Sequence, residues 1–474
     1  MNDRRRFLKR SAALAGLPLF SNAMQSALAA GPFADYRALV CVFLYGGSDS
    51  HNVVIPTAAS EWSAYVAKRG GLAQPSASVI PLSPLNAGGR TYATHPAMPK
   101  VAALFNTDRK LAFVGNVGVL LQPTTLAQYN AKSVPLPPQL FSHSDMQSHW
   151  QSGEPALPFS TGWGGRMADL LYTSNGGSAL PLCVSVSGSN QFMVAGQPDA
   201  APYQVSPNGP IKIRAWRDWD TNNANPQKVY TDRIVVPRFN KLEDEYSEIV
   251  ARSMATEVAV TAALAPIGSF RADFPGTGTD AQTNPTITNP LSNQMRMVAR
   301  LIAARATFGV KRQVFFVSLG GFDTHGDQLV LEPKLLGLLD GALDALYRKT
   351  VALGVASSVT TFTASDFGRT YTFNGSGSDH GWGGHHIVVG GSVVGGRLYG
   401  TFPVAGLSGG ALTLIDPANS ASLDVGQGRL LPTVATDVYA STLAQWMGIT
   451  QAGELASVLP HVGSFGTNSL GFLG

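Results

Sequence analysis

The chain alternates short runs of apolar residues with longer stretches in which apolar residues recur every three to four positions. Short runs rich in Val, Leu and Phe are typical of buried strands, and the longer spacing is typical of helices with one apolar face. The predicted strands are 38–44, 111–117, 180–186, 314–319, 359–363 and 386–394. The predicted helices are 98–105, 164–173, 242–265, 291–307, 332–353 and 436–447. This alternation predicts an α/β protein, a three-layer sandwich in which helices cover both faces of a mainly parallel central sheet.

One long segment, from about 190 to 293, breaks this pattern. It is polar, rich in Pro and Asn, and contains a Gly/Thr loop at 275–279. We interpret 30–474 as a single α/β domain and about 190–293 as a cap or insertion within it, a place where substrate selectivity would reside. A simple surface excursion is the alternative interpretation.

The N-terminus has the three regions of an export signal: a basic start, an apolar stretch at 12–20 and small residues at 27–29. Its Arg-Arg-x-Phe-Leu-Lys run is typical of the twin-arginine pathway, which exports folded proteins. We therefore expect 1–29 to be a twin-arginine signal peptide and the twin-arginine translocase to be a partner during export. The mature protein is then expected to be periplasmic or extracellular.

A membrane anchor is the other interpretation of the N-terminus. The apolar stretch is interrupted by Gly16 and Pro18 and is shorter than the roughly 20 residues that span a bilayer. No later segment is long and apolar enough either, so no membrane span is expected in the mature chain.

Composition and charge narrow the function classes. Hydrophobic residues make up 44% of the chain and charged residues 14%, which favours a globular protein over a disordered one. The net charge of +4 comes entirely from the first 30 residues, so the mature chain is formally neutral and lacks the basic surface of a nucleic-acid-binding protein. Cys41 and Cys183 both lie in apolar runs and are expected to be buried thiols, too few for a cysteine-rich zinc site.

Acidic residues and histidines gather just after the predicted strands. Asp49 follows the first strand, Asp323 and His325 follow the fourth, Asp366 follows the fifth, and His380 precedes the last. Because the carboxyl ends of parallel strands lie along one edge of a sheet, these residues should share one crevice. Clustered carboxylates repel one another unless a cation neutralises them, so we expect a divalent metal, one or two ions of Zn²⁺, Mn²⁺, Mg²⁺ or Ca²⁺. Each motif alone also fits an ordinary side-chain turn or helix cap.

Further polar residues are candidates for the same crevice. His385 and His386 are neighbours at the start of a strand, so they should point to opposite faces and only one, taken as His385, can be a ligand. The polar segment 141–150 contains His143, which either lines the site or belongs to a self-contained loop. Arg369 either binds substrate oxygens or forms a structural ion pair.

The motifs together are similar to those of the twin-arginine-exported family called domain of unknown function 1501. The resemblance spans almost the whole mature chain. It is carried by four patterns: Gly-Gly-x-Asp-x-x-Asn at 46–52, Gly-Gly-Phe-Asp-Thr-His at 320–325, Ser-Asp-Phe-Gly-Arg-Thr at 365–370 and Asp-His-Gly-Trp-Gly-Gly-His-His at 379–386.

That family is in turn similar to the alkaline phosphatase and sulfatase superfamily, which implies an alkaline-phosphatase-like sandwich with one or two metals. The resemblance implies a metal site of Asp323, His325 and His380. A second site around Asp49 and Asp366 lacks a histidine, because Phe367 stands where the superfamily pattern has one. His51, His143 or His385 would have to supply the missing ligand.

The attacking group is the least determined part of the site. The superfamily uses a Ser, Thr or modified Cys at a helix N-terminus, where the helix dipole supports an anion. No Cys-x-Pro-x-Arg or Ser-x-Pro-x-Arg sequence is present, so the candidates are Ser50, Ser142 and Ser144, or a metal-activated water.

Our first hypothesis is an exported metal-dependent hydrolase of phosphate or sulfate esters, including sulfated or phosphorylated glycans. In it, the catalytic candidates are Ser50, Ser144, His143 and Arg369, and the metal-ligand candidates are Asp49, Asp323, His325, Asp366, His380 and His385. A non-catalytic exported protein that binds a glycan or a partner is the second hypothesis. A metal-free serine esterase, with Ser48 or Ser50 attacking and His380 or His385 as the base, is the third.

Overall fold

The structure is a computed structural model that describes residues 33–155, 161–197, 200–211, 226–265, 267–270, 272–274 and 289–474. The predicted signal peptide, 1–29, lies outside the described residues. The predicted cap, about 190–293, is described only in part.

A ten-stranded sheet forms the middle layer of the described chain, in the order β12-β5-β11-β10-β1-β9-β6-β7-β8, with β15 also paired to β5. Its strands are β1 (Arg37–Leu44), β5 (Leu111–Gly118), β6 (Cys183–Ser185), β7 (Tyr203–Ser206), β8 (Gly209–Pro210), β9 (Arg312–Leu319), β10 (Val359–Ser365), β11 (Gly384–Gly390), β12 (Arg397–Gly400) and β15 (Val434–Ala435). Most pairs are parallel, and the antiparallel ones involve β11 and β8.

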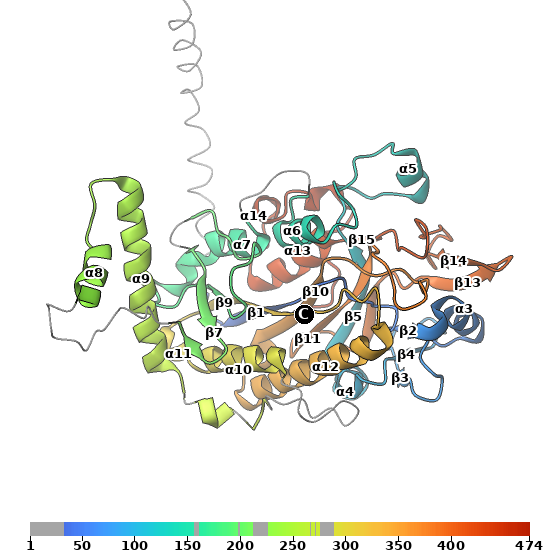
Figure 1. Ribbon diagram of the computed structural model, residues 1–474, viewed down its shortest axis with the longest axis horizontal. Helices are drawn as coiled ribbons and strands as arrows, with labels where there is room; N and C mark the ends of the chain where they lie inside the picture. The colour runs from blue at the N-terminus through green and yellow to red at the C-terminus, as the bar shows by residue number, and fades with distance from the viewer. Residues whose placement is uncertain are drawn as a thin grey trace, which may run out of the picture.

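Helices cover both faces of this sheet (Figure 1). On one face lie α4 (Pro99–Asn106), α10 (Pro290–Ala303) and α12 (Gln328–Ala352). On the other lie α6 (His143–Ser152), α7 (Trp163–Leu171), α13 (Thr436–Met447) and α14 (Ala452–Val458). The prediction of a three-layer α/β sandwich with a mainly parallel sheet is therefore confirmed.

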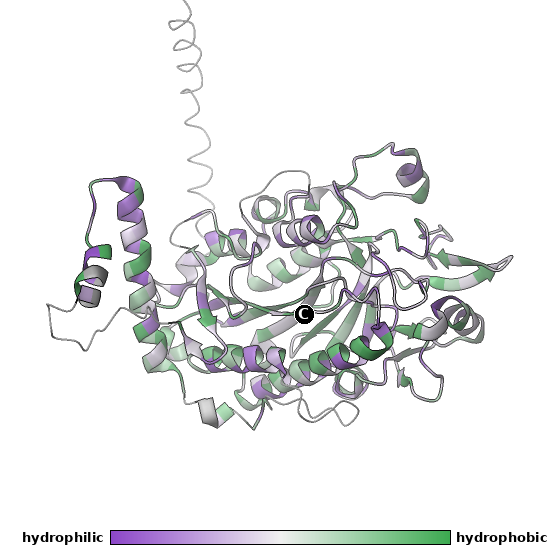
Figure 2. Cartoon of the chain, viewed as in Figure 1, coloured by the Kyte–Doolittle hydropathy of each residue, from purple (hydrophilic) through white to green (hydrophobic). Residues whose placement is uncertain are grey.

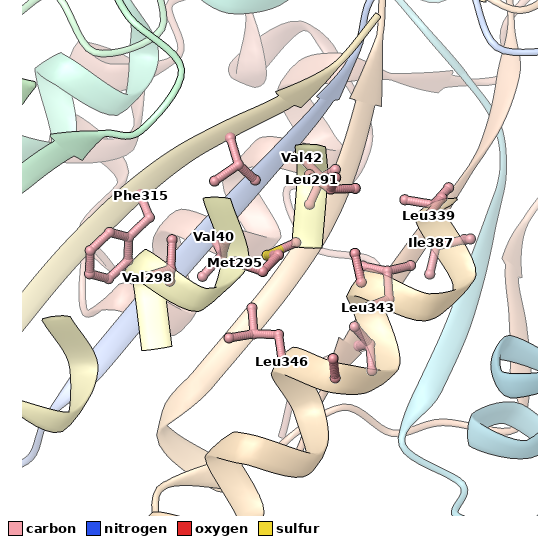
Figure 3. Close-up of a cluster of buried hydrophobic side chains, with 14 of the residues drawn as sticks. Val40, Val42, Leu291, Met295, Val298, Phe315, Leu339, Leu343, Leu346 and Ile387 are labelled. Atoms are coloured by element: carbon pink, nitrogen blue, oxygen red, sulfur yellow. The ribbon is translucent and has the colours of Figure 1, made fainter. Parts of the chain in front are cut away.

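Strand β1 shows why the layers form. Its side chains alternate between the two faces: Val40 and Val42 pack with α10 and α12, whereas Leu39, Cys41 and Phe43 pack with the opposite layer. Apolar residues on both faces make the strand a continuous apolar run, as expected for a strand in the middle of a covered sheet. Figure 3 shows Val40, Val42 and the helix side chains that cover them, and the hydropathy colouring of Figure 2 shows the apolar strands between the layers.

Smaller elements surround the sandwich. A three-stranded sheet contains β2 (Ile55–Pro56), β4 (Tyr92–Thr94) and β3 (Ile80–Leu82), and a hairpin pairs β13 (Val404–Ser408) with β14 (Ala411–Ile415). The remaining helices are α3 (Ala59–Arg69), α5 (Leu126–Ala131), α8 (Pro226–Ile234), α9 (Lys241–Ala263) and α11 (Arg305–Phe308). The described part of 190–293 supplies β7 and β8, which extend the sheet beyond β6. It also supplies α9 at this end of the molecule and α8 beyond α9 (Figure 1).

Most of the predicted elements are present, with shifted ends. The strand predicted at 180–186 is limited to Cys183–Ser185, and the helix predicted at 291–307 is interrupted at Ala304 between α10 and α11. Among the described residues, no helix combines the length and the apolar character that crossing a bilayer requires.

Candidate metal centre

The loops that carry the acidic and histidine motifs do converge. Strands β10, β1 and β9 are neighbours and run parallel, so their carboxyl ends lie together at one edge. Asp323 and His325 follow β9, Asp366 follows β10, and His380 lies in the loop that leads into β11. The fourth contributor is His143, the first residue of α6, which packs on that side of the sheet.

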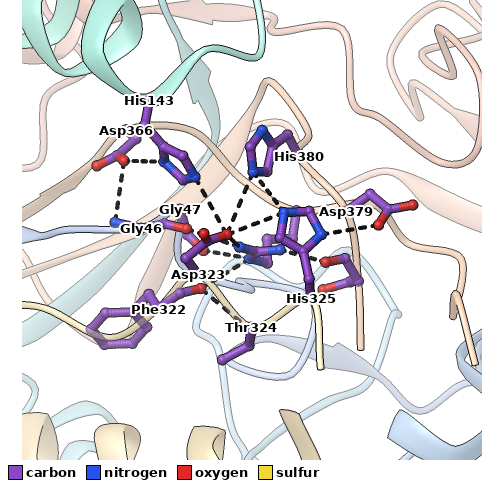
Figure 4. A network of polar contacts seen from close by, with 12 residues as sticks. Gly46, Gly47, His143, Phe322, Asp323, Thr324, His325, Asp366, Asp379 and His380 are labelled. Carbon is purple, nitrogen blue, oxygen red and sulfur yellow. Dashed lines mark hydrogen bonds and ion pairs between the residues drawn. The ribbon is translucent and has the colours of Figure 1, made fainter. Parts of the chain in front are cut away.

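Three histidine rings surround one carboxylate oxygen (Figure 4). The Nε2 atoms of His143, His325 and His380 lie 3.3, 3.2 and 3.4 Å from Oδ1 of Asp323. Ligand atoms of His143, Asp323 and His380 all lie within 4.8 Å of one another. We call these three residues and His325 the candidate metal centre.

Each of the three rings has a separate acceptor at its other nitrogen. Nδ1 of His143 lies 2.6 Å from Oδ2 of Asp366, and Nδ1 of His325 lies 3.1 Å from Oδ1 of Asp379. Nδ1 of His380 lies 2.6 Å from the carbonyl oxygen of Phe141. Such acceptors place the ring proton on Nδ1 and leave the Nε2 lone pair as a ligand, which is the usual arrangement around protein-bound metals.

The arrangement of the Nε2 atoms fits a divalent cation. Nε2 of His325 and Nε2 of His380 are 2.8 Å apart, so with both protons on Nδ1 two lone pairs face each other and need a positive charge between them. Nε2 of His143 is shielded from solvent and makes no hydrogen bond to any residue that the structure describes. Three nitrogen donors and one carboxylate oxygen suit Zn²⁺ or Mn²⁺ better than Mg²⁺ or Ca²⁺, which prefer oxygen.

Arg369 forms an ion pair with the Asp323 carboxylate of this centre. Its side chain is fully buried and its Nη2 donates to Oδ1 of Asp323. Its other hydrogen bonds go to the backbone carbonyls of Gly46, Gly47, Phe322 and Ser378. All three nitrogens of its guanidinium group thus make hydrogen bonds within the protein.

The acidity of the centre follows from burial and from these partners. Partial burial acts to raise the pKa of Asp323, but the hydrogen bond and charge of Arg369 outweigh it and lower the pKa below its ordinary value. Burial raises the pKa of Asp366, against hydrogen bonds from Gln147, His143 and the Gly46 N–H. Burial also lowers the pKa of His380, which keeps that ring neutral and able to bind a metal.

The centre is open to solvent on one side. The side chains of Asp323 and His325 are 49% and 45% exposed, whereas that of Asp366 is fully buried. The open side of the centre is therefore the side of Asp323 and His325, and Asp366 lies behind His143. Asp366 is placed as a partner of a ring rather than as a direct member of the centre.

Asp49 lies outside the centre, within a second polar cluster. Its Oδ2 pairs with the buried Arg69 of α3, and Gln328 and the His51 N–H also donate to it. Burial acts to raise the pKa of Asp49, and the charge of Arg69 outweighs it. The structure therefore gives Asp49 a protein cation as its partner, where the sequence predicted a metal.

Two other predicted residues also lie apart from the centre. Nδ1 of His385 accepts from the Asn116 N–H at 3.0 Å, and its ring packs at a tilt against Phe402. Burial holds the pKa of His385 well below the ordinary value. Ser50 is 1% exposed, and its hydroxyl makes no hydrogen bond to a described residue. Ser50 is therefore an interior residue, and His385 is half-buried.

The serines next to His143 are near the centre. Ser142 and Ser144 lie at the N-terminus of α6, and both hydroxyls donate to the Asp145 carboxylate, at 2.6 and 3.3 Å. Ser144 is exposed, so it remains accessible as a candidate nucleophile.

Sequence reasoning missed Asp379 and the Phe141 carbonyl as partners of the histidine rings. Asp379 directly precedes His380 and was visible in the motif at 379–386. Phe141 gives no sequence signal, because its contribution is a backbone oxygen directed by an unusual φ of +73°.

The fold and the site define an α/β sandwich with a candidate metal centre at the carboxyl ends of its parallel strands, and the family comparison agrees with the sequence. The profile of the family described as "Protein of unknown function (DUF1501)" matches residues 36–459. The chain belongs to this family. A search of curated proteins found no match.

Solved structures with a distant likeness include the crystal structure of Ps i-CgsB in complex with k-i-k-neocarrahexaose, at 9% identity and a TM-score of 0.34, covering 89% of this chain and 74% of that one. Another is the PsFucS1 sulfatase from Pseudoalteromonas sp., at 9% identity and a TM-score of 0.30, covering 80% of this chain and 68% of that one.

Proposed function

We propose that this protein is a metal-dependent hydrolase of sulfate or phosphate esters. The observation that carries the proposal is the convergence of three histidine Nε2 atoms on one Asp323 oxygen, with every Nδ1 held by its own acceptor. This arrangement supports the proposal of a divalent cation, and the exposure of Asp323 and His325 would let an ester reach it. Export by the twin-arginine pathway to the periplasm or beyond is part of the same proposal, and rests on the N-terminal sequence alone.

His143, His325, His380 and Asp323 would hold one ion, Zn²⁺ or Mn²⁺. A divalent ion in such a site polarises an ester oxygen and lowers the pKa of a nearby water. Asp366, Asp379 and the Phe141 carbonyl keep the rings oriented, and Arg369 keeps the Asp323 carboxylate in place. We propose one ion because Asp49 pairs with Arg69 and Asp366 pairs with His143.

The first test is the metal content of the protein purified without chelator and then supplied with zinc or manganese. We expect about one transition-metal ion per chain. The double variant His143→Ala, His380→Ala should lose it, because only two of the four ligands remain. Inductively coupled plasma mass spectrometry measures the ratio.

The matched control is His461→Ala, which removes a histidine near the C-terminus, away from the centre, and should leave the ratio unchanged. The wild type and the double variant are then assayed on aryl sulfate, phosphate monoester and phosphate diester substrates. A wild type that holds no metal after reconstitution refutes the metal centre. A wild type that holds its metal and cleaves none of these esters refutes the hydrolase and favours the non-catalytic binding protein.

A further inference from the structure

Among the residues that the structure describes, the charged side chains that contact the histidine rings of the candidate metal centre are acidic and would repel an anionic substrate. Three carboxylates surround its rings: Asp323, Asp366 and Asp379. Arg369 cannot attract such a substrate, because it is fully buried and every nitrogen is engaged within the protein. An ester carrying a negative charge therefore needs a second cation with free N–H groups at the rim.

Arg429 is such a cation. It contacts the backbone of the proposed ligand His380 and the ring of Phe141, a neighbour of that ligand. Its Nε donates to the backbone carbonyl of His380 at 2.8 Å. Its guanidinium carbon lies 5.3 Å from the ring centroid of Phe141, whose carbonyl accepts from Nδ1 of His380. Arg429 is thus placed beside the centre.

The guanidinium has N–H groups to spare. Nη1 reaches the Gly426 carbonyl only at 3.4 Å, and Nη2 makes no hydrogen bond to any residue that the structure describes. The side chain is only half-buried. A buried structural arginine would have filled these positions, as Arg369 does.

The loop that carries Arg429 is held firmly against the centre. Oδ1 of Asp424 accepts from the N–H groups of Gly426 and Gly428, which closes the turn. The Gly428 and Leu430 carbonyls then accept from the Tyr371 and Gly383 N–H groups, at 3.0 and 2.9 Å, on either side of the segment that carries His380. Arg429 is therefore fixed relative to a metal ligand, which is what a residue that orients a substrate requires.

We propose that Arg429 binds an anionic oxygen of the ester substrate beside the metal. This role rests on the proposed function, and it gives that function a residue that selects esters of tetrahedral oxyanions. The shared chemistry is a sulfate or phosphate group, which a guanidinium binds with charge-assisted hydrogen bonds.

The experiment compares metal-loaded wild type, Arg429→Gln and the matched control Arg397→Gln, a half-buried arginine of β12. Each protein is first checked for metal content and then titrated calorimetrically with inorganic sulfate and, separately, with inorganic phosphate. We expect Arg429→Gln to keep its metal and to bind the preferred anion about 10- to 100-fold more weakly, as expected for loss of a hydrogen bond to a charged group. Arg397→Gln should bind like the wild type.

The two titrations distinguish sulfate esters from phosphate esters. The anion whose affinity falls in Arg429→Gln is the group that Arg429 recognises. In turnover assays, KM should rise in Arg429→Gln more than kcat falls. Equal anion affinities in the two variants overturn the proposal, as does a metal-loaded wild type that binds neither anion. Loss of metal from Arg429→Gln also overturns it, because Arg429 would then only support His380. Failure of the proposed function is distinguishable, because it appears in the wild type itself, as an absence of metal or as a metal-loaded protein that cleaves no ester.

Discussion

At the scale of single residues, the site depends on which partner each carboxylate has. Asp366 and Asp49 occupy similar places in the sequence, each following a parallel strand. Asp366 accepts from His143, whereas Asp49 pairs with the buried Arg69. The same residue type therefore orients a proposed metal ligand in one loop and neutralises a structural cation in the next.

For Asp366, the substitution Asp366→Asn keeps the shape of the side chain and removes the charge behind His143. We expect a loss in metal affinity of about 10- to 100-fold, the usual effect of removing a partner of a ligating histidine. Competition with a chromophoric chelator measures it. An unchanged affinity would show that Asp366 does not orient His143.

For Asp49, the substitution Asp49→Ala leaves Arg69 buried without its carboxylate. We expect the free energy of unfolding to fall by about 3–5 kcal/mol, as for other broken buried ion pairs. Urea denaturation measures the change. The metal-to-protein ratio of the folded variant should stay at the wild-type value, and loss of the metal would instead make Asp49 a ligand.

At the scale of elements, the loops after β9 and β10 pack backbone against backbone. A side chain at Gly377 would lie 2.1 Å from the Thr324 carbonyl and 2.7 Å from that of His325. A side chain at Gly368 would lie 2.1 Å from the Gly383 carbonyl. Glycine is required at these positions because the loops that present His325 and His380 approach too closely for a Cβ atom.

The substitution Gly377→Ala tests this contact. The added methyl group must push the His325 loop away from the His380 loop, so we expect weaker metal binding and a loss of about 1–3 kcal/mol of stability. The control is Gly320→Ala, in the loop after β9 that carries His325, where a Cβ atom would meet nothing within 4 Å. Metal titration and thermal melting of both variants give the comparison, and equal results would exclude the packing argument.

At the scale of the whole molecule, a buried polar network connects the centre to the helix layer. Gln328 of α12 donates to both Asp49 and Glu332, and its Oε1 accepts from Ser378 at 2.7 Å. The Ser378 carbonyl accepts in turn from Arg369. Hydrogen bonds therefore connect the loops of the metal centre to the buried carboxylates of Asp49 and Glu332.

This network makes stability depend on pH. Burial and the neighbouring charge of Asp49 raise the pKa of Glu332 from 4.5 to about 8. At Glu332 the folded state therefore binds more protons than the unfolded state between these values, so the contribution of Glu332 to stability falls as pH rises from about 5 to about 8. The slope for one proton reaches about 1.4 kcal/mol per pH unit.

Glu332→Gln should remove this component. Unfolding free energies measured from pH 5 to 9 should fall less steeply in the variant than in the wild type. Asp340 and Asp437, whose pKa values burial raises to about 7, remain in both proteins and cancel in the comparison. Identical slopes would show that Glu332 is ionised in the folded state at neutral pH.

The amino-acid sequence by itself determined the sandwich, the main strands of its sheet and the convergence of Asp323, His325, Asp366 and His380. These features follow from local signals, because apolar runs report burial and parallel strands end at a common edge. The helix that carries His143 was not predicted: α6 is largely polar, so no apolar periodicity marks it.

Only the tertiary structure decided the partners of the charged groups. Arg69 neutralises Asp49 from 20 residues away. Arg369 joins Asp323 to the Gly46 and Gly47 carbonyls, which lie more than 320 residues before it in the chain. Charge pairing depends on which side chains meet in space, and the sequence spacing of a residue carries no record of that. For the same reason, no sequence pattern marks Arg429 as a substrate-binding candidate, and only its contact with the His380 carbonyl in the folded chain does so.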